Sequence, residues 1–109
     1  MDHYTNTTNH YTKTRRVQEI LQKNIDLNGA RMEVDVAIEE MSELTKELCK
    51  HRRGEKNILH IAEEIADVEI MLEQLKMIFK CRDIVAEQMD VKIERIRDGL
   101  VNAGIAGGL

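Results

Sequence analysis

Apolar residues recur at the three- and four-residue spacing of an α-helix along most of this chain, and no proline interrupts the pattern. Asn28-Gly29 and Gly54 stand where the first two helical stripes stop, as glycines often do after helix C-termini. One Phe and two Tyr among 109 residues are fewer aromatics than an all-β domain of this size normally carries. We therefore predict an all-α bundle of four helices with two long antiparallel central helices, the stripes lying within residues 14–28, 31–53, 57–79 and 83–98.

The two ends of the chain lack this periodicity. Residues 1–13 are rich in Thr, Asn and His, and we predict a mobile arm there, with Thr14 as the N-cap of the first helix. Residues 99–109 are rich in glycine and are predicted to form a flexible tail. Residues 14–98 then make up one domain.

Two of the predicted helices carry more apolar surface than a small monomer can cover. At ~1.5 Å per residue, the helix over residues 31–53 would be about 35 Å long. Its apolar stripe comprises Val34, Ala37, Ile38, Met41, Leu44, Thr45 and Leu48. The helix over residues 57–79 is apolar on several faces, so we expect it to be buried on several sides. These features predict an oligomer.

Overall composition argues against two classes of partner. The formal net charge of -4 opposes a chain that coats nucleic acid or an anionic membrane. No apolar run approaches the roughly 18 residues of a membrane span, and the polar N-terminus lacks the apolar core of a signal peptide. We expect no nucleic-acid partner, no membrane partner and a cytoplasmic location.

Charge is strongly segregated along the two central helices. Residues 33–47 hold six acids and one base, and residues 63–73 hold five acids and no Lys or Arg. Like charges four residues apart on a helix destabilise it by a few tenths of a kcal/mol. Such neighbour pairs here include Glu39–Glu43, Glu43–Glu47, Glu63–Asp67 and Glu69–Glu73.

Two acidic pairs are placed to converge. Glu40 and Glu43 are three residues apart, as are Glu64 and Asp67, so each pair projects from one side of its helix. Both pairs lie at a similar distance from Gly54, so an antiparallel hairpin would bring them together. Four such carboxylates would repel one another unless they bound a cation, and oxygen ligands favour Mg²⁺ or Mn²⁺. The alternative is a solvated acidic face.

Two other sequence features bear on the kind of metal site. A di-iron carboxylate bundle needs a histidine three residues after a glutamate, and no histidine of this chain stands there. Lys92 and Arg95, one turn apart in the predicted fourth helix, are placed either to contact phosphate or to form part of a solvated face.

The acidic segments resemble the ExxE…ExxD signature of the MazG-like all-α nucleotide pyrophosphohydrolases. Glu39-Glu40-Met41-Ser42-Glu43-Leu44 is followed, after a basic turn, by Glu63-Glu64-Ile65-Ala66-Asp67-Val68. The likeness extends to AIEEMSELTKEL and HIAEEIADVEIMLEQL and covers roughly residues 15–98.

The resemblance implies a Mg²⁺-dependent hydrolase, with Mn²⁺ as a substitute, that cleaves a nucleoside triphosphate between its α and β phosphates. By position, Glu40, Glu43, Glu64 and Asp67 would be metal ligands. Glu39 and Glu40 would be the catalytic residues, with Glu39 as a further ligand or a helper to the attacking water. Lys92 and Arg95 match a substrate-binding Lys/Arg motif of the family loosely. Because members of the family assemble as dimers or tetramers, the resemblance also implies a homodimer or homotetramer.

A second hypothesis belongs to another class of protein. A non-catalytic helical module that dimerises and offers its acidic face to a basic partner fits the composition and the periodicity equally well. Dependence on a divalent metal separates the two hypotheses.

Overall fold

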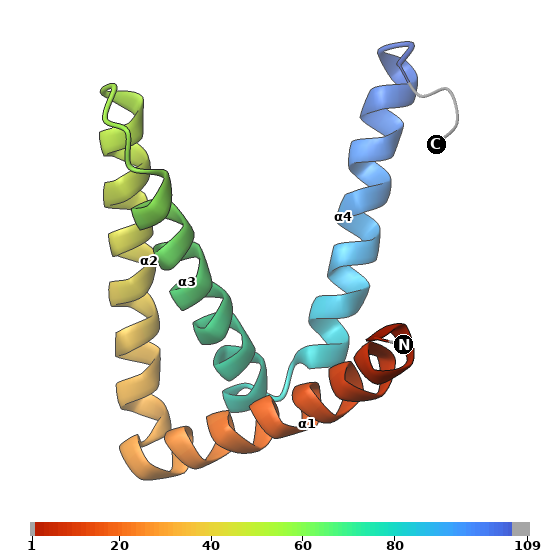
Figure 1. The fold of residues 1–109 in the computed structure, drawn as a ribbon. Helices are drawn as coiled ribbons and strands as arrows, with labels where there is room; N and C mark the ends of the chain where they lie inside the picture. The colour runs from red at the N-terminus through yellow and green to blue at the C-terminus, as the bar shows by residue number, and fades with distance from the viewer. Residues whose placement is uncertain (1, 106–109) are drawn as a thin grey trace. The chain divides into compact units, whose positions relative to one another are not determined.

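A computed structural model describes the backbone of residues 2–105 and the side chains of residues 14–105. Within this part of the chain every regular element is an α-helix, which confirms the all-α prediction (Figure 1). The four helices are α1 (Asp2–Asn28), α2 (Ala30–Arg52), α3 (Ile58–Ile78) and α4 (Arg82–Asn102).

The first helix is longer than predicted. α1 begins at Asp2, so the prediction that helix starts at Thr14 is wrong. Asn and Thr are only moderately poor helix formers, and residues 2–13 contain neither proline nor glycine to interrupt the helical backbone. The mobility predicted for residues 1–13 concerns a segment whose side chains lie outside the described residues.

The fourth helix also runs further than predicted. α4 continues through Gly99 to Asn102, because a single glycine costs a helix only about 1 kcal/mol. It ends at Gly104, where φ is +76°. There the Gly104 amide donates to the Val101 carbonyl at 2.9 Å, and the Ile105 amide donates to the Leu100 carbonyl at 3.0 Å. These two bonds form a Schellman motif. Residues 106–109 of the predicted tail lie outside the described part.

The turn between α2 and α3 has the predicted glycine stop. Gly54 adopts a φ of +99°, which a residue with a Cβ adopts only with strain. Its amide donates to the His51 carbonyl at 2.9 Å, and the Glu55 amide donates to the Lys50 carbonyl at 3.1 Å. This Schellman motif ends α2 and reverses the chain, so α3 packs against α2 as an antiparallel hairpin.

The chain divides into two units, residues 1–78 and residues 79–109. In the first unit, α1 packs on both α2 and α3, and it lies across the end of the hairpin opposite the connecting turn (Figure 1). Leu21 and Ile25 of α1 are buried there. The second unit holds α4, none of whose residues is buried.

The face that α2 turns toward α3 contains only part of its apolar stripe. The residues of α2 that are buried or half-buried at heptad spacing are Glu33, Ala37, Glu40, Leu44 and Glu47. Ile38, Met41 and Leu48 of the apolar stripe are exposed, at 61%, 38% and 46%. Helical periodicity identifies both stripes but not which one faces the neighbouring helix. We call this α2–α3 contact, lined by carboxylates, the acidic seam.

The third helix is less buried than predicted. In α3 only Met71 and Gln74 are buried, whereas Ile58, Leu59, Ile65, Ile70 and Leu72 are exposed. The expectation of burial on several sides is therefore wrong for the single chain, because one neighbouring hairpin helix and α1 cover only part of its surface. Burial of these side chains in an oligomer stays a prediction. Among the described residues, no helix combines the length and apolar content needed to cross a membrane.

Candidate metal centre

Three glutamates of α2 point into the acidic seam at intervals of seven residues, which is two helical turns. They are Glu33, Glu40 and Glu47. Different residues face α2 at each level of the seam, so the three carboxylates have different environments. The two outer carboxylates accept hydrogen bonds from amide side chains, whereas the middle one faces further carboxylates.

At the end of the seam nearest α1, Glu33 is only 4% exposed and accepts hydrogen bonds from three amides. Its Oε1 accepts from Gln74 at 2.6 Å and from Asn24 at 3.0 Å, and its Oε2 accepts from Asn28 at 3.0 Å. Asn24 also donates to the Gln74 amide oxygen at 2.8 Å. This amide cluster joins α1, α2 and α3 around one carboxylate, whose hydrogen bonds offset its loss of water.

At the turn end of the seam, Glu47 is 8% exposed and bonded to Asn57. The Asn57 amide donates to the Glu47 Oε1 at 3.0 Å and to the Glu47 backbone carbonyl at 2.9 Å. Lys50 forms an ion pair with the other carboxylate oxygen at 3.2 Å. The hydrogen bond from Asn57 lowers the pKa of Glu47, and Lys50 adds to this effect, so the carboxylate is held ionised.

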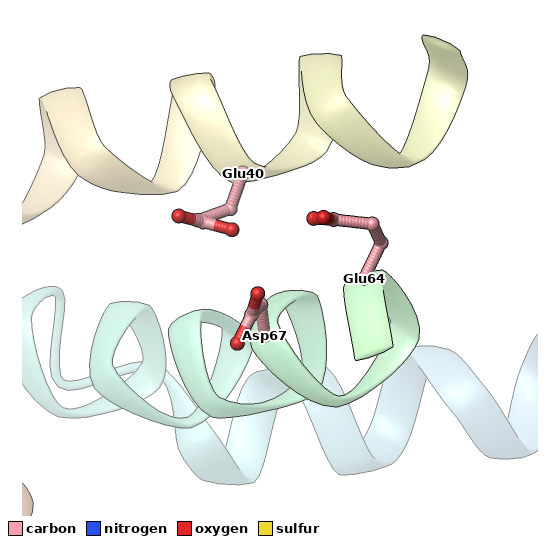
Figure 2. A group of neighbouring side chains, drawn as sticks. All are labelled: Glu40, Glu64 and Asp67. Carbon is pink, nitrogen blue, oxygen red and sulfur yellow. The ribbon is translucent and has the colours of Figure 1, made fainter. Parts of the chain in front are cut away.

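In the middle of the seam, Glu40 of α2 faces Glu64 and Asp67 of α3 (Figure 2). Each of the three offers a carboxylate oxygen, and these oxygens all lie within 4.8 Å of one another. The Oε2 atom of Glu64 is buried and has no hydrogen-bond partner. A buried carboxylate oxygen without a donor is costly, and such an atom calls for an explanation such as an ion.

The electrostatics of the middle group differ from those of both ends. Burial raises the pKa of Glu40, and the charge of Asp67, a hydrogen bond with Asp67 and the charge of Glu64 raise it further. Burial also raises the pKa of Glu64, and the charges of Asp67 and Glu43 raise it further. The three carboxylates therefore destabilise one another when all are ionised.

These groups fit a hard divalent cation. A bound cation would supply the missing partner of the Glu64 oxygen and would offset the repulsion among the three acids. Oxygen-only ligands suit Mg²⁺ or Mn²⁺, and Mg²⁺ commonly binds through one or two carboxylates while keeping positions for water or phosphate. Glu40, Glu64 and Asp67 are the residues that would hold it.

The other predicted site residues lie at different places. Glu43 is half-buried and its charge acts on Glu64, but it is not part of the group within 4.8 Å, because its position falls at the edge of the seam. Glu39 is exposed next to Glu40. Lys92 and Arg95 are exposed residues of α4, in the second unit.

The amides were not identified from the sequence. Gln74 follows Asp67 by seven residues, and Asn57 precedes Glu64 by seven, so both continue the helical rows that carry the acids. That spacing is the one signal that could have pointed to them. Their partners lie ten to fifty residues away along the chain, beyond the reach of a helical pattern.

Comparisons of the chain with protein-family models, with curated proteins and with solved structures found no match. The resemblance to the MazG-like family therefore rests on the amino-acid sequence of the chain itself.

The raised pKa values predict an unusual pH dependence of stability. Without metal, the folded protein should bind protons at Glu40 and Glu64 at a pH where the unfolded chain, with glutamate pKa values of about 4.3, does not. Stability in EDTA should therefore increase as the pH falls from neutral toward the glutamate pKa of the unfolded chain. Glu47 has a lowered pKa, so its contribution is lost only below about pH 4.3.

Saturating Mg²⁺ should reverse this trend, because protons compete with the metal for the same oxygens. Urea denaturation between pH 5 and 8, with EDTA or with Mg²⁺, measures both profiles. The double variant E40Q/E64Q removes both titrating groups and should flatten the difference between the two conditions. Identical pH profiles for wild type and this variant in EDTA would contradict the prediction.

Proposed function

We propose that this protein is a Mg²⁺-dependent nucleoside triphosphate pyrophosphohydrolase that releases a nucleoside monophosphate and pyrophosphate. The observation that carries the proposal is the group of Glu40, Glu64 and Asp67, in which a buried oxygen of Glu64 has no partner. The arrangement of these acids on consecutive helices also follows the ExxE…ExxD signature that the sequence resembles.

In this proposal Glu40, Glu64 and Asp67 would hold the ion, and Glu43 at the edge of the seam would be a fourth ligand. When bound, Mg²⁺ supplies positive charge to phosphate oxygens and makes a water molecule more acidic. A water oxygen attacks the α phosphorus, the bond from that phosphorus to the bridging oxygen of the β phosphate breaks, and pyrophosphate leaves. Glu39 accepts the proton of the attacking water.

Lys92 and Arg95 complete the proposed site. Their cationic side chains would orient the departing pyrophosphate through charge-assisted hydrogen bonds. A homodimer or homotetramer arranged as a MazG-like bundle is part of the proposal, because it would also cover the exposed apolar side chains of α2 and α3.

The experiment that tests this function is incubation with Mg²⁺ and a panel of canonical and modified ribo- and deoxyribonucleoside triphosphates. Separation by chromatography identifies the products. Monophosphate and pyrophosphate in equal amounts, without a diphosphate intermediate, are expected. Absence of turnover with every nucleotide, in Mg²⁺ and in Mn²⁺, would overturn the proposal.

One observation favours the alternative of a non-catalytic interaction module. The exposed apolar stripe of α2, with Ile38, Met41 and Leu48, leaves a surface suited to packing against another helix. Such a module would use this stripe for dimerisation and the acidic seam for a basic partner. It would have no need of a divalent cation.

Thermal unfolding separates the two functions. Mg²⁺ at about 100 times its Kd should stabilise a metal-binding protein by about 2.7 kcal/mol, which raises Tm by about 10 °C or more. NaCl of equal ionic strength serves as the control for screening. The variant D67N should lose the Mg²⁺ effect, whereas E69Q, at an exposed position of the same helix, should keep it. An equal response of wild type and D67N would favour the interaction module.

A further inference from the structure

The hydrogen-bonded groups around Glu33 and Glu47, here called the two amide clusters, lie at matched distances on either side of the middle group. Glu33 precedes Glu40 by seven residues and Gln74 follows Asp67 by seven, so one cluster lies two turns toward α1. Glu47 follows Glu40 by seven residues and Asn57 precedes Glu64 by seven, so the other cluster lies two turns toward the connecting turn. The three levels of the seam therefore share one register of α2 against α3.

That register needs a directional determinant. The remaining side chains of the seam include Ala37, Leu44, Val68 and Met71, whose apolar contacts have little directionality. A slip by one helical turn moves the helices by about 5.4 Å, which exceeds the 4.8 Å span of the middle oxygens. Such a slip would separate Glu40 from one of its two partners.

Buried amide–carboxylate bonds supply that directionality. Gln74 is completely buried, and its amide uses both its nitrogen and its oxygen in bonds to Glu33 and Asn24. Asn57 is 6% exposed and holds Glu47 at both the side chain and the backbone. In helical assemblies, single buried polar groups of this kind select one register, because any other leaves them without partners.

We propose that Gln74 and Asn57 are positioning residues, which hold Glu40 opposite Glu64 and Asp67 by fixing the register of the hairpin. Neither residue belongs to the group of three carboxylates. The proposal rests on the proposed function in one respect, namely that the middle group binds a divalent cation. The register itself is a property of the hairpin with or without the ion.

The first test is the Kd for Mn²⁺ of the full-length protein, measured as free Mn²⁺ by electron paramagnetic resonance. Q74M keeps the volume and helix propensity of the side chain but removes its amide, and N57S shortens the amide at the opposite end. Each should weaken Mn²⁺ binding about 10-fold or more, as loss of groups that orient metal ligands does. The control L21A destabilises a buried position of α1 outside the seam and should leave the Kd unchanged.

The second test measures the register without metal. Spin labels at S42C and E63C, both exposed, report the distance between α2 and α3 once the free thiols Cys49 and Cys81 are replaced by serine. Dilution with unlabelled protein isolates distances within one chain. The unaltered seam should give one narrow distribution in EDTA, and Q74M or N57S should broaden or shift it, whereas L21A should not.

The outcomes of the two tests separate the two ideas. A wild-type protein that binds no Mn²⁺ overturns the metal site, and the label distances still decide whether the amides fix the register. Unchanged distributions in both Q74M and N57S overturn the positioning role. So does a Mn²⁺ Kd that rises no more in these two variants than in L21A. If Q74M fails to fold, N57S provides the same test from the other end of the seam.

Discussion

Replacing Glu64 with glutamine is expected to lower the rate of pyrophosphate release about 100-fold or more. The loss of a metal ligand should raise the activation barrier by a few kcal/mol, and each 1.36 kcal/mol lowers the rate tenfold. The same change should make the metal-free protein more stable. Glutamine carries no charge to repel Asp67 and Glu43, and its amide can donate to a neighbouring carboxylate in place of the unpartnered oxygen. Product analysis in Mg²⁺ and urea denaturation in EDTA measure the two effects.

The matched control is E63Q, which makes the same change at the adjacent exposed position of α3. It should leave turnover unchanged, because Glu63 is not among the carboxylates gathered in the seam. An E64Q variant with full pyrophosphate release would show that the middle group is not the proposed catalytic centre. A loss of activity accompanied by unfolding in EDTA would show instead that Glu64 has a structural role.

Replacing Glu33 with alanine is expected to lower the stability of the folded protein substantially. The substitution removes the common acceptor of Asn24, Asn28 and Gln74, and it leaves the amide nitrogen of the fully buried Gln74 without an oxygen acceptor. Leaving a buried donor unsatisfied costs about 1–3 kcal/mol, so the free energy of unfolding should fall by about 1–3 kcal/mol. For a small domain with a stability of about 5–15 kcal/mol, this is a large fraction of the total.

Urea denaturation at neutral pH measures this loss, and D35A is its control. Asp35 lies two residues further along α2 and is exposed, so its replacement should change the stability by less than about 0.5 kcal/mol. Equal stabilities of E33A and D35A would show that the amide cluster contributes nothing to holding α1 on the hairpin.

The two predictions concern glutamates of similar appearance in the sequence, with opposite expected effects on stability. Glu33 is surrounded by donors, so its removal should destabilise the fold. Glu64 is surrounded by other acids, so its neutralisation should stabilise the metal-free protein. Functional sites often retain such locally unfavourable groups, whose cost is offset by packing elsewhere or by a bound ligand.

Local features of the sequence were sufficient to predict the α-helices of this protein. Apolar spacing and the absence of proline predict helices, and Gly29 and Gly54 mark the ends of the first two. The depth of Glu40, Glu64 and Asp67 relative to Gly54 was also sufficient to predict that they meet, because an antiparallel hairpin brings equal distances from its turn to one level. The limits of α1 and α4 were missed, since weak helix formers and a single glycine do not stop a helix.

Only the tertiary structure decided which glutamates are satisfied and which are not. A helical pattern gives the angle of each residue about the helix axis but not which side of the helix contacts a neighbouring helix. The burial of Glu33 and Glu47 was therefore not predictable. Their partner Gln74 lies in α3, and their partner Asn57 directly precedes that helix. The absence of such a donor opposite Glu64, which distinguishes the candidate metal centre from an ordinary acidic surface, likewise depends on contacts between residues distant in sequence.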